Sequence, residues 1–353
     1  MEKKQQLIAL WRQNFHDPEE FIQFYFDKKY SDRNSLVYEE NGKALSALLM
    51  LPYPINWSGE TLTTSYISGA CTMREARNRG LMTFLLQKAF QEMNKQGIAF
   101  STLIPAEERL FKYYGNLGYA PIFDHSVEKY RITPEVISSQ GQSPVKYDPH
   151  FTAHLFQYFN QKMESRNCCI QHPQDDYQAI VEEIYLSGGR LIATFNSNIP
   201  TGWAIAIPER DKIKIKEIFF NSPEDKKTIL ETAFQIWHIP TIECFIPPTE
   251  SSQSYGMARI TDVQQLLQLQ AQKHPDLSVS IKVNDPHLPA NQGIYHLFQG
   301  TCVKAPQTDN PADIETDIPT LTKALTGYHI DQLPQSLSSI SSHEVPYMSL
   351  MMD

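Results

Sequence analysis

Apolar and polar residues near the start of the chain follow patterns that distinguish helices from strands. Residues 7–15 and 17–25 repeat apolar side chains with the period of an amphipathic helix. Residues 35–50 form two apolar stretches around Asn41-Gly42, a dipeptide typical of tight hairpin turns. The sequence therefore predicts two helices followed by a β-hairpin.

The next segments alternate between strand and helix. Residues 66–73 form a short apolar run, and after a basic turn at 74–82 the helical period returns over 83–90. A second strand is predicted over 98–104, followed at 106–119 by a short helix that a glycine and an aromatic residue close. This part of the chain is therefore expected to alternate strand, helix, strand and helix.

The basic turn between strand and helix is a candidate phosphate site. The first N–H groups of a helix have no intrahelical partners, and the helix dipole favours negative charge at that end. The spacing of glycines matches neither G-x-G-x-x-G nor G-x-x-x-x-G-K-[ST], the two commonest phosphate loops. A cofactor that carries a pyrophosphate, bound by a different loop, is the leading expectation.

Two motifs in this region resemble those of one enzyme superfamily. Residues 77–82 resemble R-x-x-G-x-[G/A], the coenzyme A pyrophosphate loop of the GNAT acyl-CoA N-acyltransferases, with Met82 in place of the usual small residue. Residues 114–119 resemble the helix end Y-x-x-x-G-[FY], which carries the tyrosine acid in that family. Both motifs occur in the expected order, so the resemblance implies an acyltransferase.

The C-terminal part extends the resemblance to nearly the full chain. Residues 283–297, 317–321 and 325–328 resemble the sterol carrier protein-like domain that follows the GNAT domains of Eis-type acetyltransferases. The implied fold is α/β with mixed sheets: tandem GNAT-like domains followed by a sterol carrier protein-like domain.

Changes in composition divide the chain into three predicted domains. A polar linker over 133–143 and a Ser-rich connection over 249–255 separate them. The expected domains are a GNAT acetyl-CoA-binding domain over 1–132, a degenerate GNAT-like domain over 144–248 and the sterol carrier protein-like domain over 256–353. The middle domain is described as degenerate because residues 221–226, after its strand at 213–220, lack the phosphate loop.

The middle and last domains also show regular patterns. Helices are expected at 148–166, 174–187 and 223–237, and strands at 190–195, 199–208, 212–219, 278–283, 294–298 and 300–303.

The resemblance assigns acetyl-CoA as acetyl donor and a small-molecule or peptide amine as acceptor. Backbone groups of 70–72 would hold the acetyl and pantetheine, and N–H groups of 78–83 the pyrophosphate. Tyr114 falls on the general acid, because a phenol stays protonated at neutral pH and can donate to a thiolate. Tyr113 should point elsewhere by helical geometry. The expected donor-binding residues are Ala70, Cys71, Thr72, Arg77, Asn78, Arg79, Gly80, Leu81, Met82, Thr83, Ala106 and Glu107.

The catalytic base is less sharply defined by the sequence. In Eis-type enzymes the chain's own terminal carboxylate enters the active site, which would here be that of Asp353. The apolar run 350–352 favours a docked tail, whereas chain ends are commonly frayed. Glu107 and Glu108 are alternative bases. Cys71 could in principle form an acyl intermediate, but a small buried apolar role is the favoured interpretation.

Composition argues against several other classes of function. The 353 residues carry a net charge of -9, which argues against a dedicated nucleic-acid binder and suits a cationic amine substrate. Five cysteines without a C-x-x-C pair indicate neither a disulfide framework nor a zinc site, so no metal is expected. No apolar run is long enough to span a bilayer, so no membrane partner is expected and the cytoplasm is the expected location. The resemblance to Eis-type acetyltransferases also implies a homo-oligomer, because related proteins are oligomers.

Two other classes of function remain open at this stage. The chain could be a non-catalytic acyl-CoA or lipid-binding module, or a scaffold for partner proteins.

Overall fold

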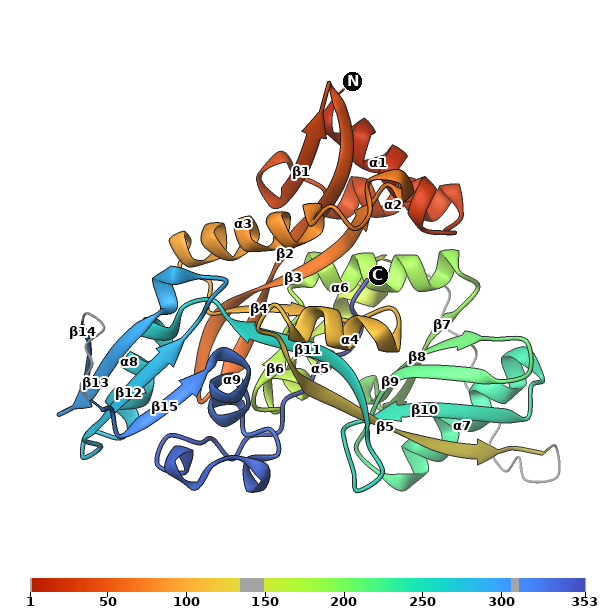
Figure 1. The fold of residues 1–353 in the computed structure, drawn as a ribbon. Coiled ribbons are helices and arrows are strands. Elements are labelled where there is room, and N and C mark those ends of the chain that lie inside the picture. The colour runs from red at the N-terminus through yellow and green to blue at the C-terminus, as the bar shows by residue number, and fades with distance from the viewer. Residues whose placement is uncertain (1, 134–148, 306–310, 353) are drawn as a thin grey trace. The chain divides into compact units, whose positions relative to one another are not determined.

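The computed structural model describes residues 2–133, 149–305 and 311–352 (Figure 1). They form two compact units: one contains residues 2–123 and 255–346, and the other contains 124–254 and 347–352. Most of the predicted linker at 133–143, residues 144–148 of the predicted second domain and Asp353 lie outside the described residues. None of the helices in the described ranges is long and apolar enough to cross a membrane.

The first unit begins with the predicted helices and hairpin. The bounds of these elements are α1 Lys3–Asn14, α2 Glu19–Lys29, β1 Ser35–Glu40 and β2 Lys43–Trp57. At the hairpin turn, Asn41 and Gly42 have φ angles of 52° and 73°. The left-handed region at both positions is what a type I′ turn requires, so the Asn-Gly signal is confirmed.

Strand β2 continues well past the predicted hairpin. It reaches Trp57 and pairs antiparallel with β3 (Glu60–Thr72) along most of that length. The sequence did not predict this long ladder, because Pro52 and Pro54 interrupt the strand pattern. Both prolines lie beyond Leu49, the last β2 residue that pairs with β1, so they remove no β1–β2 hydrogen bond.

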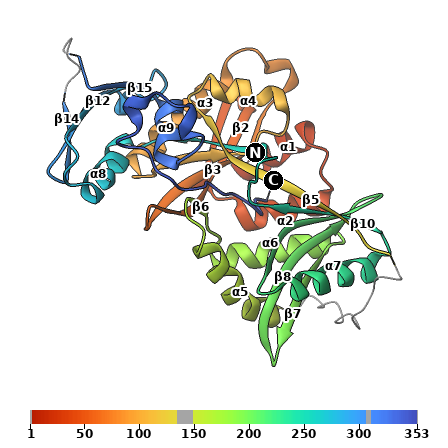
Figure 2. The same ribbon diagram turned by 90° about the horizontal axis from the view of Figure 1, so that it is seen from below.

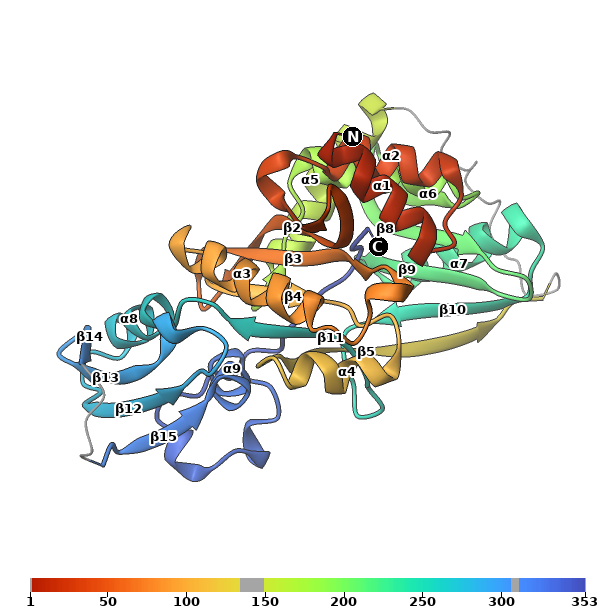
Figure 3. The ribbon, with the colours of Figure 1, turned by 45° about the horizontal axis from the view of Figure 1, so that its top comes forward.

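The sheet of the first unit has the order β1-β2-β3-β4-β11. Helix α3 (Leu81–Lys95) leads to β4 (Phe100–Leu103), which pairs parallel with β3 and is followed by α4 (Glu108–Gly115). Figure 3 shows α3 alongside β3 and β4. Strand β11 (Gln253–Ile260) pairs antiparallel with β4, with Met257 opposite Leu103. The predicted connection at 249–255 therefore ends in a strand that returns to this sheet.

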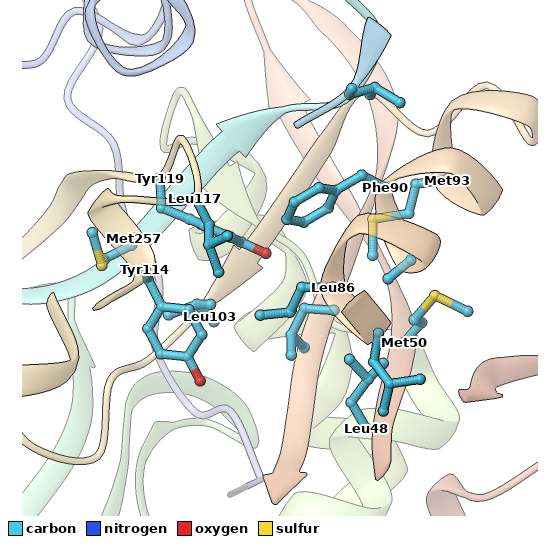
Figure 4. Packing of buried hydrophobic residues seen from close by; sticks show 14 of the residues in the cluster. Leu48, Met50, Leu86, Phe90, Met93, Leu103, Tyr114, Leu117, Tyr119 and Met257 are labelled. Carbon is cyan, nitrogen blue, oxygen red and sulfur yellow. The ribbon is translucent and has the colours of Figure 1, made fainter. Parts of the chain in front are cut away.

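Helices pack on both faces of β2 and β3. On one face Leu48, Met50 and Ile67 contact apolar residues of α3, including Leu86 and Phe90, in one buried cluster (Figure 4). Alternate strand residues point to the opposite face. That face is covered by α1 and α2.

The C-terminal part of this unit contains a second sheet with the order β14-β13-β12-β15. Its elements are α8 Val263–Lys273, β12 Val279–Asn284, β13 Gly293–Phe298, β14 Thr301–Ala305, β15 Ile314–Asp317 and α9 Ile318–Thr326. Three of the strands were predicted; β15 was missed. Arg259 of β11 donates to Asp285 at 2.6 Å and to the Leu117 carbonyl at 2.6 Å, with both charges buried. This pair links the small sheet to the large one.

The second unit begins within β5 (Ala120–Arg131), at Asp124. Its strands form a mixed sheet with the order β5-β10-β9-β8-β7. Its elements are α5 Pro149–Glu164, α6 Gln174–Leu186, β7 Arg190–Asn196, β8 Ile199–Pro208, β9 Ile213–Phe220, α7 Pro223–Trp237 and β10 Thr241–Ile246. Helices α5, α6 and α7 pack against this sheet (Figure 2). Helix α7 packs on the face that carries Ala204, while Trp203 contacts Phe159 of α5 and Tyr177 of α6. The Ser222 hydroxyl caps α7 by accepting from the Asp225 N–H, so no open phosphate loop precedes this helix.

Candidate active site

Strand β3 contains a β-bulge at the start of the predicted acetyl site. Ala47 pairs with Cys71 and Leu49 with Ser68, so Gly69 and Ala70 together face Leu48. Gly69 has φ 59°, the left-handed conformation of a glycine bulge. This bulge was not predicted from the sequence, although an isolated glycine within a strand is its usual signal.

The pairing of β3 with its parallel neighbour β4 ends before the bulge. The β3–β4 register pairs run from Thr64–Phe100 to Tyr66–Thr102, whereas β3 continues to Thr72. Backbone groups of the predicted residues Ala70, Cys71 and Thr72 therefore lie beyond the end of the parallel ladder. Such an edge can hydrogen-bond an extended ligand in the manner of an added strand.

Cys71 fits the apolar interpretation that the sequence favoured. Its side chain is buried, and burial raises the pKa of the thiol to about 12. The thiol is therefore protonated at neutral pH and is a poor nucleophile.

The predicted phosphate loop joins β3 to α3. A short 3-10 turn over Arg74–Ala76 is followed by Asn78 and Gly80, whose φ angles are 63° and 75°. Gly80 precedes α3 and supplies no side-chain cap. The N–H groups of the first α3 residues 81–83 are thus available to an anion. A Cβ placed on Gly80 would meet nothing within 4 Å, so the approach to this helix end is open.

The two arginines of the loop already contact protein groups. Arg79 forms an exposed bidentate salt bridge with Glu40: its Nη2 donates to Oε1 at 2.9 Å and its Nη1 to Oε2 at 3.2 Å. Arg77 donates to the Asn14 side chain at 2.9 Å and to the Thr72 carbonyl at 3.3 Å. Charge complementarity to a pyrophosphate would therefore require Arg79 to share or leave its carboxylate partner, and the backbone N–H groups are the better-placed donors.

Tyr114 lies on α4 at the border of the buried cluster. Its side chain is 8% exposed and packs near Tyr119, with ring centroids 5.7 Å apart. Figure 4 shows its hydroxyl directed away from Tyr119 and Leu117. No residue in the described ranges hydrogen-bonds this hydroxyl. Burial, and secondarily Tyr113, raise its pKa, so the group is a protonated phenol at neutral pH.

Tyr113 has a different environment, as helical geometry predicted. Its hydroxyl lies 3.2 Å from Thr83 Oγ1, in the first turn of α3. This contact connects α4, which carries Tyr114, with α3, which follows the candidate phosphate loop.

The carboxylates near the start of α4 are exposed. Glu107 is hydrogen-bonded to Arg109, and this bond with the arginine charge lowers the pKa of the Glu107 carboxyl. A lowered pKa makes a carboxylate a weaker proton acceptor. Ala106 and Glu108 are exposed neighbours.

The chain end before Asp353 is docked onto the second unit. Tyr347 makes backbone hydrogen bonds with Cys168 and with Ile170, at 3.0 and 3.1 Å. The side chains of Leu350, Met351 and Met352 are buried. Residues 347–352 are therefore held as a docked segment, as their apolar character suggested, while the predicted catalytic Asp353 lies outside the described residues.

A buried carboxylate holds this docked segment. Glu217 of β9 is fully buried and accepts hydrogen bonds from Arg166, from the Tyr347 hydroxyl at 2.8 Å and from the Ser349 hydroxyl at 2.7 Å. Burial and the Glu217 charge raise the pKa of Tyr347 well above its ordinary value, so this phenol is a proton donor. His172 adds a contact to the Ser349 carbonyl at 2.9 Å. No local sequence pattern indicated this set.

Two family models match parts of the chain. Residues 1–122 match the model of the acetyltransferase (GNAT) domain, and residues 263–340 match the sterol carrier protein domain. The chain thus contains an N-terminal GNAT acetyltransferase domain and a C-terminal sterol carrier protein domain. A search of curated proteins finds no match.

Solved structures share the fold over almost the whole chain. A probable N-acyltransferase from Enterococcus faecalis is 14% identical with a TM-score of 0.74, and Eis1 from Mycobacterium abscessus is 12% identical with a TM-score of 0.71. A GCN5-related N-acetyltransferase from Anabaena variabilis is 21% identical with a TM-score of 0.69. Each comparison covers 98% of this chain and 96% of the other. The expected fold class, GNAT-like domains with a sterol carrier protein-like domain, is confirmed.

Proposed function

We propose that this protein transfers the acetyl group of acetyl-CoA to a primary amine by direct attack. The observation that carries the proposal is a bulged strand that leads through an open glycine loop into an uncapped helix. The strand edge at 70–72 offers backbone groups to the acetyl and pantetheine parts, and the first N–H groups of α3 offer donors to the pyrophosphate. Ala106 and Glu107 complete the proposed donor site.

Tyr114 is the proposed general acid. Attack by a neutral amine on the thioester carbonyl ends with a departing thiolate that needs a proton. The Tyr114 hydroxyl is protonated, lies at the border of the core and has no hydrogen-bond partner among the described residues. It can therefore donate its proton without first breaking an existing bond.

The proposed base is the terminal carboxylate of Asp353. Two observations support it: residues 347–352 are docked rather than frayed, and Arg109 weakens the rival Glu107 by lowering its pKa. The base would accept the proton that the ammonium loses as the new amide forms.

The acceptor is proposed to be a small-molecule or peptide amine, and not a nucleic acid. The net charge of -9 supports a cationic acceptor. We further propose a homo-oligomer that works in the cytoplasm.

Thioester cleavage tests this function. The purified chain is mixed with acetyl-CoA and one member of a panel of polyamines, aminoglycosides and lysine peptides; free thiol and the acetylated amine are then measured. Amine-dependent release with a matching acetyl product is expected. Coenzyme A binding without transfer to any amine would instead indicate a non-catalytic acyl-CoA-binding module. No binding at all would leave the scaffold alternative.

A further inference from the structure

The bulge of β3 is contacted by two aromatic side chains from the N-terminal helices. Tyr25 of α2 is fully buried, and its hydroxyl lies 2.5 Å from Ser68 Oγ, the residue directly before the bulge. Trp11 of α1 packs on Gly69 itself, because a Cβ placed on that glycine would collide with the indole ring. Each helix thus contacts one of two adjacent residues of the same strand.

Trp11 is itself held on several sides. Its indole N–H donates to Asp17 Oδ2 at 2.7 Å, and its ring centroid lies 4.7 Å from that of Tyr25 and 4.8 Å from that of Phe15. The side chain is 4% exposed. Such a ring has little freedom to move away, so it forms a fixed surface against the strand.

The strand needs this support at the bulge more than elsewhere. Residues 64–66 are paired on both sides, with β2 and with β4, whereas Ile67 and Ser68 pair with β2 alone. Gly69 takes its left-handed backbone without strain, but glycine is also conformationally permissive, so neighbouring contacts have to select this conformation. The contacts that the sheet does not supply at 68–69 come from Tyr25 and Trp11.

We infer that Trp11 and Tyr25 are positioning residues for acetyl transfer, which set the bulge so that the backbone at 70–72 meets the thioester carbonyl. The inference rests on the proposed function. The two side chains act through Ser68 and Gly69 and need not touch the substrate. They control the acetyl end of the donor site, while the pyrophosphate end at Gly80 is built separately.

The first test removes one hydroxyl and keeps its ring. Tyr25→Phe should lower kcat about tenfold and leave coenzyme A affinity unchanged, since a displacement of 1 Å costs ~10²-fold and this change shifts the strand by less. Ser68→Ala should have the same effect, and the double variant should be no worse than either single variant. Tyr53→Phe is the matched control: it removes a buried tyrosine hydroxyl, which contacts Lys29, from the same unit.

The second test uses steric rescue. Gly69→Ala should reduce kcat strongly, because the methyl group collides with Trp11 and the φ of 59° is strained for alanine. Adding Trp11→Leu removes the collision but not the strain, so the double variant should be more active than Gly69→Ala alone. Trp11→Leu by itself should be less active than the wild type, and Trp11→Phe should retain more activity.

Hydrogen exchange separates this inference from the proposed function. In Tyr25→Phe and Trp11→Leu, amides of 69–72 should exchange faster than in the wild type, with those of α3 unchanged. This readout needs no acceptor amine. Wild-type exchange and wild-type kcat in both variants would overturn the inference while leaving acetyl transfer intact. Failure of the wild type to acetylate any amine would overturn the proposed function, whatever the exchange shows.

Discussion

At the scale of single residues, Tyr114 combines a ring buried in an apolar cluster with a hydroxyl oxygen that is not fully buried. This hydroxyl has no hydrogen-bond partner in the described part of the chain. It is therefore free to meet a ligand at the border of the cluster. The resemblance of residues 114–119 to the family motif and this geometry agree on the same residue.

Tyr114→Phe should lower kcat on the order of 10²-fold and leave coenzyme A affinity unchanged, because only the donated proton is lost. Thiol release and calorimetric titration measure the two quantities. Tyr119→Phe is the control for loss of a buried hydroxyl in the same cluster. Wild-type turnover in Tyr114→Phe would leave Tyr114 with a packing role alone.

Gly80→Glu should weaken coenzyme A binding by at least about tenfold, because a carboxylate beside the first α3 N–H groups repels the pyrophosphate. Calorimetry gives the affinity. Gly97→Glu is a matched control, because Gly97 also has positive φ, 67° against 75°, and open space around its Cα. Equal affinities in the two folded variants would mean that the phosphate site lies elsewhere.

Cys71 should be dispensable as a nucleophile. Its pKa of about 12 means that at pH 8 about one thiol in 10⁴ is ionised. Iodoacetamide should label it slowly in the folded protein, and Cys71→Ala should keep turnover within about twofold, as expected of direct attack. An acetyl group trapped on Cys71 by rapid acid quench, detected by peptide mass spectrometry, would argue for an acyl-enzyme instead.

At the scale of secondary-structure elements, local signals were sufficient for much of the fold. The turn at Asn41-Gly42 and the period of α3 depend on near neighbours in the sequence, and both were predicted. The pairing of β11 with β4 joins residues such as Met257 and Leu103, which are far apart in the chain. No local pattern specifies such a partner. The Arg259–Asp285 pair was missed for the same reason.

The candidate site likewise has parts that depend on local sequence and parts that depend on tertiary contacts. The candidate phosphate loop and Tyr114 belong to contiguous motifs, so they could be predicted from the sequence. The packing of Trp11 on Gly69 and the three side chains that donate to Glu217 depend on tertiary contacts, so they required the structure.

The docked segment at the chain end should depend on Glu217. Glu217→Gln replaces a buried carboxylate that is paired with Arg166, and breaking such a pair costs about 3 kcal/mol. Carboxypeptidase should then remove the residues that follow Tyr347 faster than in the wild type. Glu209→Gln, which alters an exposed pair with Lys212, should change little. Equal digestion of the three proteins would show that apolar burial alone holds the segment.

At the scale of the whole molecule, each compact unit is built from segments that are not contiguous in the sequence. The segment after the second unit returns to the sheet of the first, and residues 347–352 then join the second. Up to Met352, the last residue that the structure describes, the chain therefore passes between its units three times. Truncating it at an expected domain boundary would remove β11 or the docked segment, so activity has to be tested in the full chain.

The chain end offers the test that distinguishes a terminal carboxylate from a side-chain base. A short Gly-Ser extension after Asp353 moves the terminal carboxylate, whereas Asp353→Asn changes only the side chain. If the terminal group is the base, the extension should lower kcat strongly and the substitution only slightly, with coenzyme A affinity similar in both.

The extended variant also has to retain its docked segment for this comparison to be valid. Protection of residues 347–352 from hydrogen exchange, measured in both variants, provides that control, because Glu217 and His172 hold the segment through Tyr347 and Ser349 rather than through Asp353. With docking preserved, loss of turnover in the extended variant alone assigns the base to the terminal carboxylate. Full turnover in that variant would assign proton removal to another group, and Glu107→Gln would be the next variant to measure.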